Sequence, residues 1–323
     1  MKLLEIKNLV VEYDTEDGKV YALNGVSLSL EEGSTLGLVG ETGAGKTTTA
    51  LSIMRLLPKR LSAIKEGQII FDGESLLAKT EADMRLIRGE KVSMIFQDPM
   101  TSLNPVLRIG DQIREAIVLH SSNMSKEQAD ARVDEILEMV GIPASRKSEY
   151  PHQFSGGMRQ RVVIAMALSC QPKLLLADEP TTALDVTIQA QVLNMMQELK
   201  QRLNTSMILI THDLGVVCQT CDCVAVMYAG EIVEYGTAYD LFVEKRHHPY
   251  TNGLFTSLPD PKLDSKRLKP IPGLTPDSMG LPSGCKFHPR CNKCMEICKT
   301  HAPEECYIGK EHMIKCHLFS QEA

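Results

Sequence analysis

The segment 40–47, GETGAGKT, constrains this chain more than any other, because it fits the pattern G-x-x-x-x-G-K-[ST]. An apolar run, 34–40, precedes it, and a segment with helical periodicity, 47–57, follows it. A strand that ends in a glycine-rich turn and opens a helix directs backbone amides and the positive end of the helix at one anion. The pattern therefore predicts a phosphate-binding loop, in which Lys46 reaches the β- and γ-phosphates and Thr47 offers its hydroxyl to Mg²⁺.

An acidic pair downstream supplies the second half of such a site. The apolar run 173–178, KLLLAD, ends at Asp178, and Glu179 follows directly. A carboxylate at the end of a buried strand can hold Mg²⁺, through water, beside a bound phosphate. Alternatively, Asp178 caps a helix and Glu179 is an ordinary surface residue. The phosphate loop upstream favours the Mg²⁺ interpretation.

Strands and helices alternate along most of the chain, which predicts a mostly parallel sheet with helices on both faces. The first 35 residues predict short antiparallel strands, and 223–234 predicts a hairpin. Beyond about residue 255, prolines are frequent and periodic segments are few, so we expect an irregular extension. The other expected strands are 69–71, 92–96, 173–178 and 206–211, and the other expected helices are 111–120, 125–140, 157–170 and 188–203.

The composition argues against several classes of function. The chain has 323 residues, with 35 basic and 41 acidic side chains, a formal net charge of -6 and a pI of about 5.9. Nucleic-acid-binding proteins usually carry a basic balance or patch, which is not seen here. No apolar run approaches the roughly 18 residues that a membrane helix needs. The N-terminal sequence is already acidic at Glu5, unlike a signal peptide, so we expect a cytosolic chain.

The segment 155–160, SGGMRQ, resembles the signature motif of ABC-transporter ATPase domains, and it lies between the phosphate loop and the acidic pair as that family requires. The segment 96–98 resembles the family's glutamine loop, 182–185 its D-loop, and His212 its switch histidine. Tyr13 stands where the family has an aromatic residue that stacks on adenine, although it could also be an ordinary half-buried strand residue. Together these motifs cover residues 1 to about 235.

A finer resemblance is to the dipeptide and oligopeptide importers. The segments 97–105, QDPMTSLNP, and 151–155, PHQFS, are similar to those ATPases, as is the tail 284–291, GCKFHPRC. Met100 and Met158 resemble the D-type subunit rather than its F-type partner. Importers of nickel peptides share these features, so the resemblance also allows nickel as the solute.

The resemblance implies a P-loop (RecA-like) core with an antiparallel β-subdomain, a helical subdomain at about 101–158, and a C-terminal extension. On this basis we expect an ATPase domain over 1–255 and the extension over 256–323. It also implies that Glu179, His212 and Gln97 act in catalysis and that Thr47, Gln97 and Asp178 serve Mg²⁺. The residues expected to bind ATP, from this chain or its partner, are Tyr13, Gly40, Glu41, Thr42, Gly43, Ala44, Gly45, Lys46, Thr47, Thr48, Ser155, Gly156, Gly157, Asp178 and Asp185.

Six of the ten cysteines lie between Cys285 and Cys316, and in the cytosol they should be reduced. Four thiolates suit an iron–sulfur cluster or Zn²⁺. Within this group of six, only one pair, at 291 and 294, has the C-x₂-C spacing of a zinc ribbon. The set that resembles the subfamily's tail is Cys285, Cys291, Cys298 and Cys316, which we expect to hold a [4Fe–4S] cluster, with Zn²⁺ or no metal as alternatives.

The resemblance further implies partners: two transmembrane permease subunits, a second, F-type ATPase subunit in a head-to-tail heterodimer, and an extracytoplasmic peptide-binding protein. It places the chain at the cytoplasmic face of the cell membrane as a peripheral protein. A soluble ABC ATPase that acts on nucleic acid or ribosomes is the less favoured alternative. Such proteins usually have two cassettes or a long coiled-coil insertion, and we expect no nucleic-acid partner.

Overall fold

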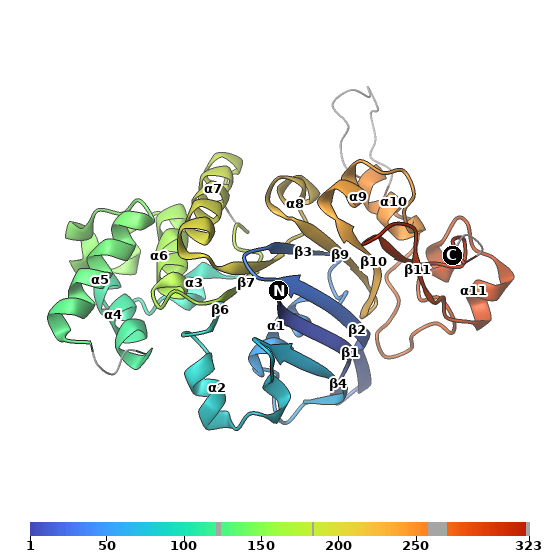
Figure 1. The fold of residues 1–323 in the computed structure, drawn as a ribbon, viewed down its shortest axis with the longest axis horizontal. Helices are drawn as coiled ribbons and strands as arrows, with labels where there is room; N and C mark the ends of the chain where they lie inside the picture. The colour runs from blue at the N-terminus through green and yellow to red at the C-terminus, as the bar shows by residue number, and fades with distance from the viewer. Residues whose placement is uncertain (121–123, 183, 258–269, 321–323) are drawn as a thin grey trace. The chain divides into compact units, whose positions relative to one another are not determined.

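The computed structural model describes residues 1–120, 124–182, 184–257 and 270–320 (Figure 1). The chain divides into two compact units. Unit 1 comprises Met1–Leu3, Leu30–Thr35 and Ala78–Ile210, and unit 2 comprises Leu4–Ser29, Leu36–Leu77 and Thr211–Ala323. Within the described ranges, no helix combines the length and apolar character needed to cross a bilayer.

Unit 1 contains three parallel strands, β6 (Val92–Ile95), β7 (Leu174–Asp178) and β8 (Ser206–Ile210). In register, Ile95 is opposite Ala177, and Asp178 is opposite Ile210. Every residue of β7 and β8 is buried, as expected for strands covered on both faces. The parallel pairing brings the carboxyl end of β7, with Asp178, to the same edge as that of β6, which leads into Gln97.

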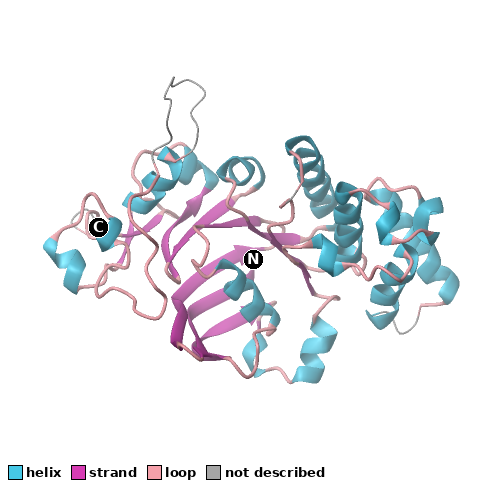
Figure 2. Cartoon of the chain, turned by 180° about the vertical axis from the view of Figure 1, so that it is seen from behind, coloured by secondary structure: helices cyan, strands magenta, loops and turns pink. Residues whose placement is uncertain are grey.

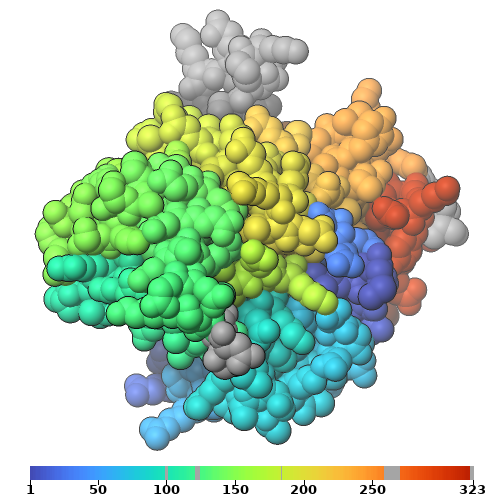
Figure 3. Space-filling model, turned by 60° about the vertical axis from the view of Figure 1, so that its left-hand side comes forward, coloured from blue at the N-terminus to red at the C-terminus, as the bar shows by residue number. Residues whose placement is uncertain are grey.

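Helices α4 to α7 of unit 1 begin and end close to the predicted positions, whereas α2 and α3 were not predicted. Helices α4, α5 and α6 lie against one another (Figures 1 and 2) and form one continuous surface in the space-filling view (Figure 3). Ser125 and Gln128 form a capping box that fixes the start of α5. The bounds are α2 (Glu81–Ile87), α3 (Pro99–Ser102), α4 (Ile109–His120), α5 (Lys126–Met139), α6 (Gly156–Leu168) and α7 (Val186–Leu203), with short 3₁₀ turns η2 (Ala144–Ser148) and η3 (Pro151–Gln153).

Unit 2 contains most of an antiparallel sheet whose strand order is β2-β1-β4-β5. The prediction of short strands over the first 35 residues was wrong, since β1 (Lys2–Thr15) and β2 (Gly18–Glu31) each have 14 residues. The reason is that β1 absorbs Asn8, which has φ 47, as a register shift against β4 (Ser62–Phe71) instead of ending there. The remaining strand is β5 (Glu74–Ser75), followed by η1 (Leu76–Ala78).

The second sheet in unit 2 contains β3 (Thr35–Val39), parallel to β9 (Cys223–Tyr228). The predicted hairpin joins β9 to β10 (Glu231–Thr237). The C-terminal extension adds β12 (Met313–Lys315) to β10 and then β11 (Glu305–Tyr307) to β12, all antiparallel. The helices are α1 (Lys46–Met54), α8 (Leu214–Thr220), α9 (Ala238–Phe242), α10 (Pro249–Thr256) and α11 (Glu296–Thr300), with the turn η4 (His288–Arg290).

Candidate functional site

The phosphate-binding loop of unit 2 requires glycine at its two ends. Gly40 and Gly45 have φ angles of 152 and 105. A Cβ at Gly40 would lie 2.3 Å from the carbonyl oxygen of Met227, and one at Gly45 would lie 2.7 Å from Leu23 Cδ2. Gly43 has φ 83 with no atom within 4 Å of its absent side chain. The loop backbone therefore packs closely against β9 at Gly40 and against β2 at Gly45, and at Gly43, between them, it is open to a ligand.

Lys46, the first residue of α1, is buried inside this loop. Its Nζ donates hydrogen bonds to the carbonyl oxygens of Gly40 and Glu41, at 2.7 and 3.0 Å. The ammonium group is therefore positioned within the turn, at the N-terminus of a helix, where a phosphate would bind. Thr42 and Thr47 are exposed, and Thr48 is half-buried.

Glu41 is held by two side chains that sequence analysis did not assign to the site. Its backbone N–H donates to Tyr250 Oη at 2.8 Å, and its carboxylate accepts two hydrogen bonds from Arg290, at 2.6 and 3.0 Å. The ion pair with Glu41 raises the pKa of Arg290 further above its ordinary value. No sequence pattern signals these contacts, because more than 200 residues separate the partners.

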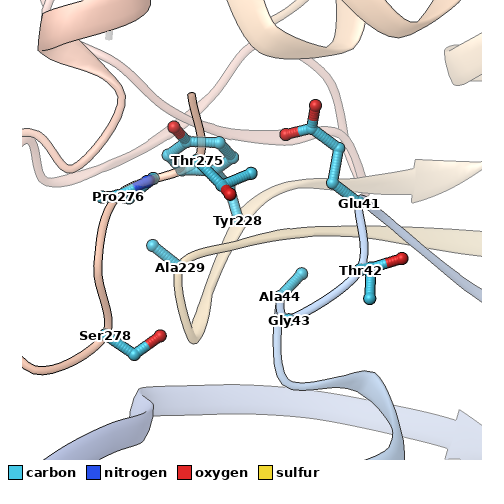
Figure 4. Close-up of a pocket in the computed structure, with 9 residues that line it drawn as sticks. All are labelled: Glu41, Thr42, Gly43, Ala44, Tyr228, Ala229, Thr275, Pro276 and Ser278. Atoms are coloured by element: carbon cyan, nitrogen blue, oxygen red, sulfur yellow. The ribbon is translucent and has the colours of Figure 1, made fainter. Parts of the chain in front are cut away.

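A pocket lies behind the loop (Figure 4). The segment Glu41–Ala44 forms one side, and the turn at Tyr228 and Ala229 forms another. The third side comes from the extension, through Thr275, Pro276 and Ser278. The extension therefore contributes directly to the surroundings of the phosphate loop.

Unit 1 brings together two of the predicted catalytic residues. Gln97 Nε2 donates to Glu179 Oε2 at 3.0 Å, and Thr182 Oγ1 donates to the same oxygen at 2.9 Å. Glu179 has a left-handed φ of 46, and its N–H donates to the carbonyl of Ile210. Asp178, one residue earlier, is buried at the end of β7. The two carboxylates therefore lie at the end of one strand, and that of Glu179 has fixed donors.

The predicted signature segment starts α6. Ser155 is the N-cap, with its hydroxyl accepting from the N–H of Met158 at 3.4 Å. Ser155 and Gly156 are exposed, while a Cβ on Gly157 would lie 2.5 Å from Ile188 Cγ2. Glycine at 157 therefore permits close contact between α6 and α7 and leaves the amides at the start of α6 accessible.

The remaining predicted residues lie on separate elements. Asp185 caps α7 by accepting from the N–H of Ile188 at 2.9 Å, whereas Ala183, in the same predicted D-loop, lies outside the described residues. His212 is exposed just before α8, in unit 2. Tyr13 is half-buried in β1, opposite Ser62. The roles of these residues remain predictions.

The four cysteines predicted to form a cluster lie near one another. The thiol of Cys316 interacts electrostatically with those of Cys285, Cys291 and Cys298. Three of the sulfurs also accept a backbone N–H from the residue two positions later, as in the 3.4 Å contact from Lys293 to Cys291; the other two pairs are Phe287 to Cys285 and Leu318 to Cys316.

Burial raises the pKa of three of these thiols, Cys285, Cys291 and Cys316. It raises the pKa of Cys285 to about 11 and that of Cys316 to about 12. At neutral pH such thiols ionise only beside a cation. Of the two extra cysteines, exposed Cys294 donates to the carbonyl of Met295 and buried Cys306 donates to that of Glu304. The first four thiols therefore lie close together, and a metal bound by them remains a prediction.

A second buried group in unit 2 contains Glu234, His247 and His312, whose ligand atoms lie within 4.8 Å of one another. Both ring nitrogens of His247 face acceptors: Nδ1 is 2.8 Å from Glu234 Oε1, and Nε2 is 2.9 Å from the carbonyl of Glu244. Since Nδ1 faces a carboxylate and Nε2 faces a carbonyl, both carry hydrogen and His247 is an imidazolium. The group therefore forms a buried ion pair.

The pKa values agree with this assignment. Burial alone would raise the pKa of Glu234, but hydrogen bonds from His247 and His312 lower it to about 2. Burial would lower the pKa of His247, but the hydrogen bond and charge of Glu234 raise it. His312, next to β12, donates through Nε2 to Glu234 Oε1 at 2.9 Å. Glu234 on β10 thereby attaches the last strand of the extension.

The sequence matches models of known protein families. Residues 23–182 match the family model described as "ABC transporter". Residues 233–298 match the model described as "Oligopeptide/dipeptide transporter, C-terminal region". The second match contains Glu234, His247, Tyr250 and Arg290, which sequence analysis did not assign, and three of the four predicted cluster cysteines.

Among curated proteins, the chain is 49% identical to the dipeptide transport ATP-binding protein DppD of Bacillus subtilis, covering 100% of this chain and 96% of that protein. It is 50% identical to the oligopeptide transport ATP-binding protein OppD of Escherichia coli, covering 94% and 89%. Among solved structures, the ATP-binding cassette MJ0796 bound to ADP and Pi is similar, with a TM-score of 0.65 and 27% identity, covering 73% of this chain and 98% of that one.

We predict that Glu234→Gln lowers the free energy of unfolding by about 3–5 kcal/mol, because His247 loses its buried partner. The pKa of His247 is raised above 6.5, so its contribution is complete below that pH and is lost as the pH rises through the raised value. The contribution of Glu234, with its pKa lowered from 4.5, is lost only as the pH falls toward about 2. The free energy of unfolding of wild type and of Glu234→Gln is measured by thermal unfolding at about pH 6 and about pH 9.

The control for this prediction is Glu231→Gln on the same strand, which removes an ion pair with Lys315 at 2.8 Å but no histidine contact. The difference between wild type and Glu234→Gln should be smaller at about pH 9, while that for Glu231→Gln should stay constant. An equal difference for Glu234→Gln at both pH values contradicts the ion-pair assignment.

Proposed function

The chain belongs to the ABC transporter family, as an ATP-hydrolysing member of the dipeptide and oligopeptide transport group, and from this we propose that it powers peptide import. The observation that carries the proposal is the phosphate loop, with Lys46 held inside the turn by two backbone carbonyls. The match of residues 233–298 to the transporter C-terminal region supports peptides as the cargo. Nickel is the alternative solute, and action on nucleic acid or ribosomes is less favoured.

ATP is bound, in this proposal, through the phosphate loop from Gly40 to Thr48, with adenine stacked on Tyr13. Thr47, Gln97 and Asp178 serve Mg²⁺, which neutralises charge on the phosphates. Phosphoryl transfer depends mainly on positioning and charge stabilisation. The backbone amides of the loop and the ammonium group of Lys46 are the donors to the phosphates in this proposal. The fixed conformation of the loop supports its assignment as the phosphate-binding element.

Glu179 is the residue that we propose to orient the attacking water and accept its proton. Its Oε2 accepts from Gln97 and Thr182, which fixes the orientation of the carboxylate. The water oxygen then attacks the γ-phosphorus as the bond to the leaving oxygen of ADP breaks. His212 is proposed to contact the γ-phosphate.

A second ATPase subunit, of the F-type, is proposed to complete the site in a head-to-tail dimer. The exposed start of α6, with Ser155, Gly156 and Gly157, would contact the γ-phosphate held by the partner. The 13-residue helix and its accessible amides support this assignment. Asp185 is proposed to contact the opposite subunit.

The other partners follow from the family. We propose that the helical segment at about 101–158 contacts two transmembrane permease subunits, and that an extracytoplasmic peptide-binding protein delivers the cargo. The chain would then act at the cytoplasmic face of the membrane as a peripheral protein. We retain 1–255 as the ATPase domain and 256–323 as the extension.

The extension is proposed to hold a [4Fe–4S] cluster through Cys285, Cys291, Cys298 and Cys316, with Zn²⁺ as the alternative. Mutual interaction of the thiols and three N–H···S hydrogen bonds support this set. Hydrogen bonds to sulfur are one of the means by which proteins tune such clusters. The role proposed for the cluster is structural, because the helices and strands in the described part of the extension, 270–320, are short.

We predict that Glu179→Gln lowers the ATPase rate about 10²- to 10⁴-fold, because the general base is lost, while ATP still binds. Lys46→Ala should instead abolish binding. Glu198→Gln, an exposed carboxylate in the same unit, is the matched control and should change neither quantity. Phosphate release and nucleotide binding are measured on the purified complex. Full activity of Glu179→Gln contradicts the assignment.

For the cysteines, anaerobically purified protein should contain about four irons and four acid-labile sulfides per chain, with broad absorption near 400 nm. Cys298→Ser should lose the iron, whereas Cys306→Ser, at an equally buried thiol outside the set, should retain it. One zinc without iron would instead support the Zn²⁺ alternative, and the absence of both metals contradicts a metal site.

Peptide import is tested by uptake of a labelled dipeptide into cells that make this chain with its co-purifying membrane subunits. Uptake should depend on Lys46, and Lys46→Ala is the negative variant. Labelled Ni²⁺ is measured in parallel. Uptake of Ni²⁺ without uptake of the peptide supports nickel as the solute. If the chain is purified from these cells with no membrane subunit bound to it, both importer proposals are contradicted.

A further inference from the structure

Arg290, in the cysteine-rich extension, is fixed at several points. Its side chain is only 4% exposed, and both Nη atoms donate to the Glu41 carboxylate. Nε donates to the carbonyl of Pro272 at 3.0 Å, and Nη1 contacts Tyr228 Oη at 3.4 Å. An arginine held by this many acceptors presents a rigid, bidentate fork to its carboxylate partner.

Glu41 is equally constrained from the side of the loop. Its carbonyl accepts from Lys46, its N–H donates to Tyr250, and its carboxylate meets Arg290. Glu41 directly follows Gly40, where the chain turns away from the sheet. Fixing residue 41 therefore fixes the direction in which the loop leaves β3 (Figure 4).

The charge of Glu41 adds a second consideration. A carboxylate in a loop that binds phosphates opposes the binding of an anion. The guanidinium of Arg290 compensates that charge through two hydrogen bonds, and the carboxylate is only partly exposed, at 29%. Without Arg290, the loop would carry an uncompensated negative charge. Glu41 would then keep only its contacts with Lys46 and Tyr250.

We propose that Arg290 is a positioning residue for the nucleotide: by bracing Glu41, the extension holds the phosphate loop in its binding conformation and cancels the adverse charge. This inference rests on the proposed binding of ATP to the loop. When a protein spends only a fraction of its time in the competent conformation, its apparent dissociation constant rises by the inverse of that fraction. Loss of the brace should therefore weaken binding while leaving the catalytic Glu179 unchanged.

The test measures the dissociation constant of MgADP for the full chain. Arg290→Gln should raise it about tenfold, and Arg290→Lys, which keeps the charge but not the fork, should raise it less. The double variant Glu41→Gln/Arg290→Gln should recover part of the loss, because the uncompensated charge is removed. Lys315→Gln, which breaks a different ion pair of the extension, is the matched control and should bind as wild type.

Two further measurements separate this positioning role from a general loss of protein stability. The ATPase rate at saturating nucleotide should stay within about twofold of wild type in Arg290→Gln, while KM rises. If Arg290→Gln does not fold, Glu41→Gln removes the same ion pair from the loop and should raise the dissociation constant by loss of the brace alone. Wild-type affinity in the folded variants overturns the inference, whereas a wild-type chain that does not bind MgADP overturns the proposed function itself.

Discussion

The approach of Gly40 to the carbonyl of Met227 is the contact on which the conformation of the phosphate loop depends. A Cβ would lie 2.3 Å from that oxygen, so only glycine allows β3 to end against β9 and turn at once into the loop. That turn places Lys46 at the start of α1, where its ammonium meets the carbonyls of residues 40 and 41. Any side chain at position 40 would displace β3, the loop and α1 together.

Charged groups attach the extension to the rest of unit 2. Glu234 on β10 binds His312 beside β12 and pairs with His247, and Arg290 binds Glu41 in the phosphate loop. Buried ion pairs contribute little net stability compared with apolar packing, but breaking one is costly because the remaining charge is left unpaired. These contacts hold β12 against β10 and bring Arg290 to the phosphate loop.

Much of the fold followed from sequence because local patterns dictate it. The apolar runs before Asp178 and after Thr205 indicated buried strands, and the helical periodicity of 125–140 placed the start of α5 within a residue. The 14-residue strands β1 and β2 were not predicted at full length, because register shifts in β1 depend on its partner strand. The three-residue strands β11 and β12 are too short for a period-two pattern to be detected.

The sequence by itself determined the phosphate loop and the acidic pair, because each depends on residue types at fixed local spacing, whereas the set of four cysteines followed from the resemblance to the subfamily's tail and remains a prediction. It also placed Gln97, which the structure joins to Glu179 at 3.0 Å. Only the tertiary structure brought Tyr250 and Arg290 to Glu41, and His312 to Glu234. These partners are separated by 78 to 249 residues. Such contacts are fixed by how strands pair and where the extension packs, and no local spacing encodes them.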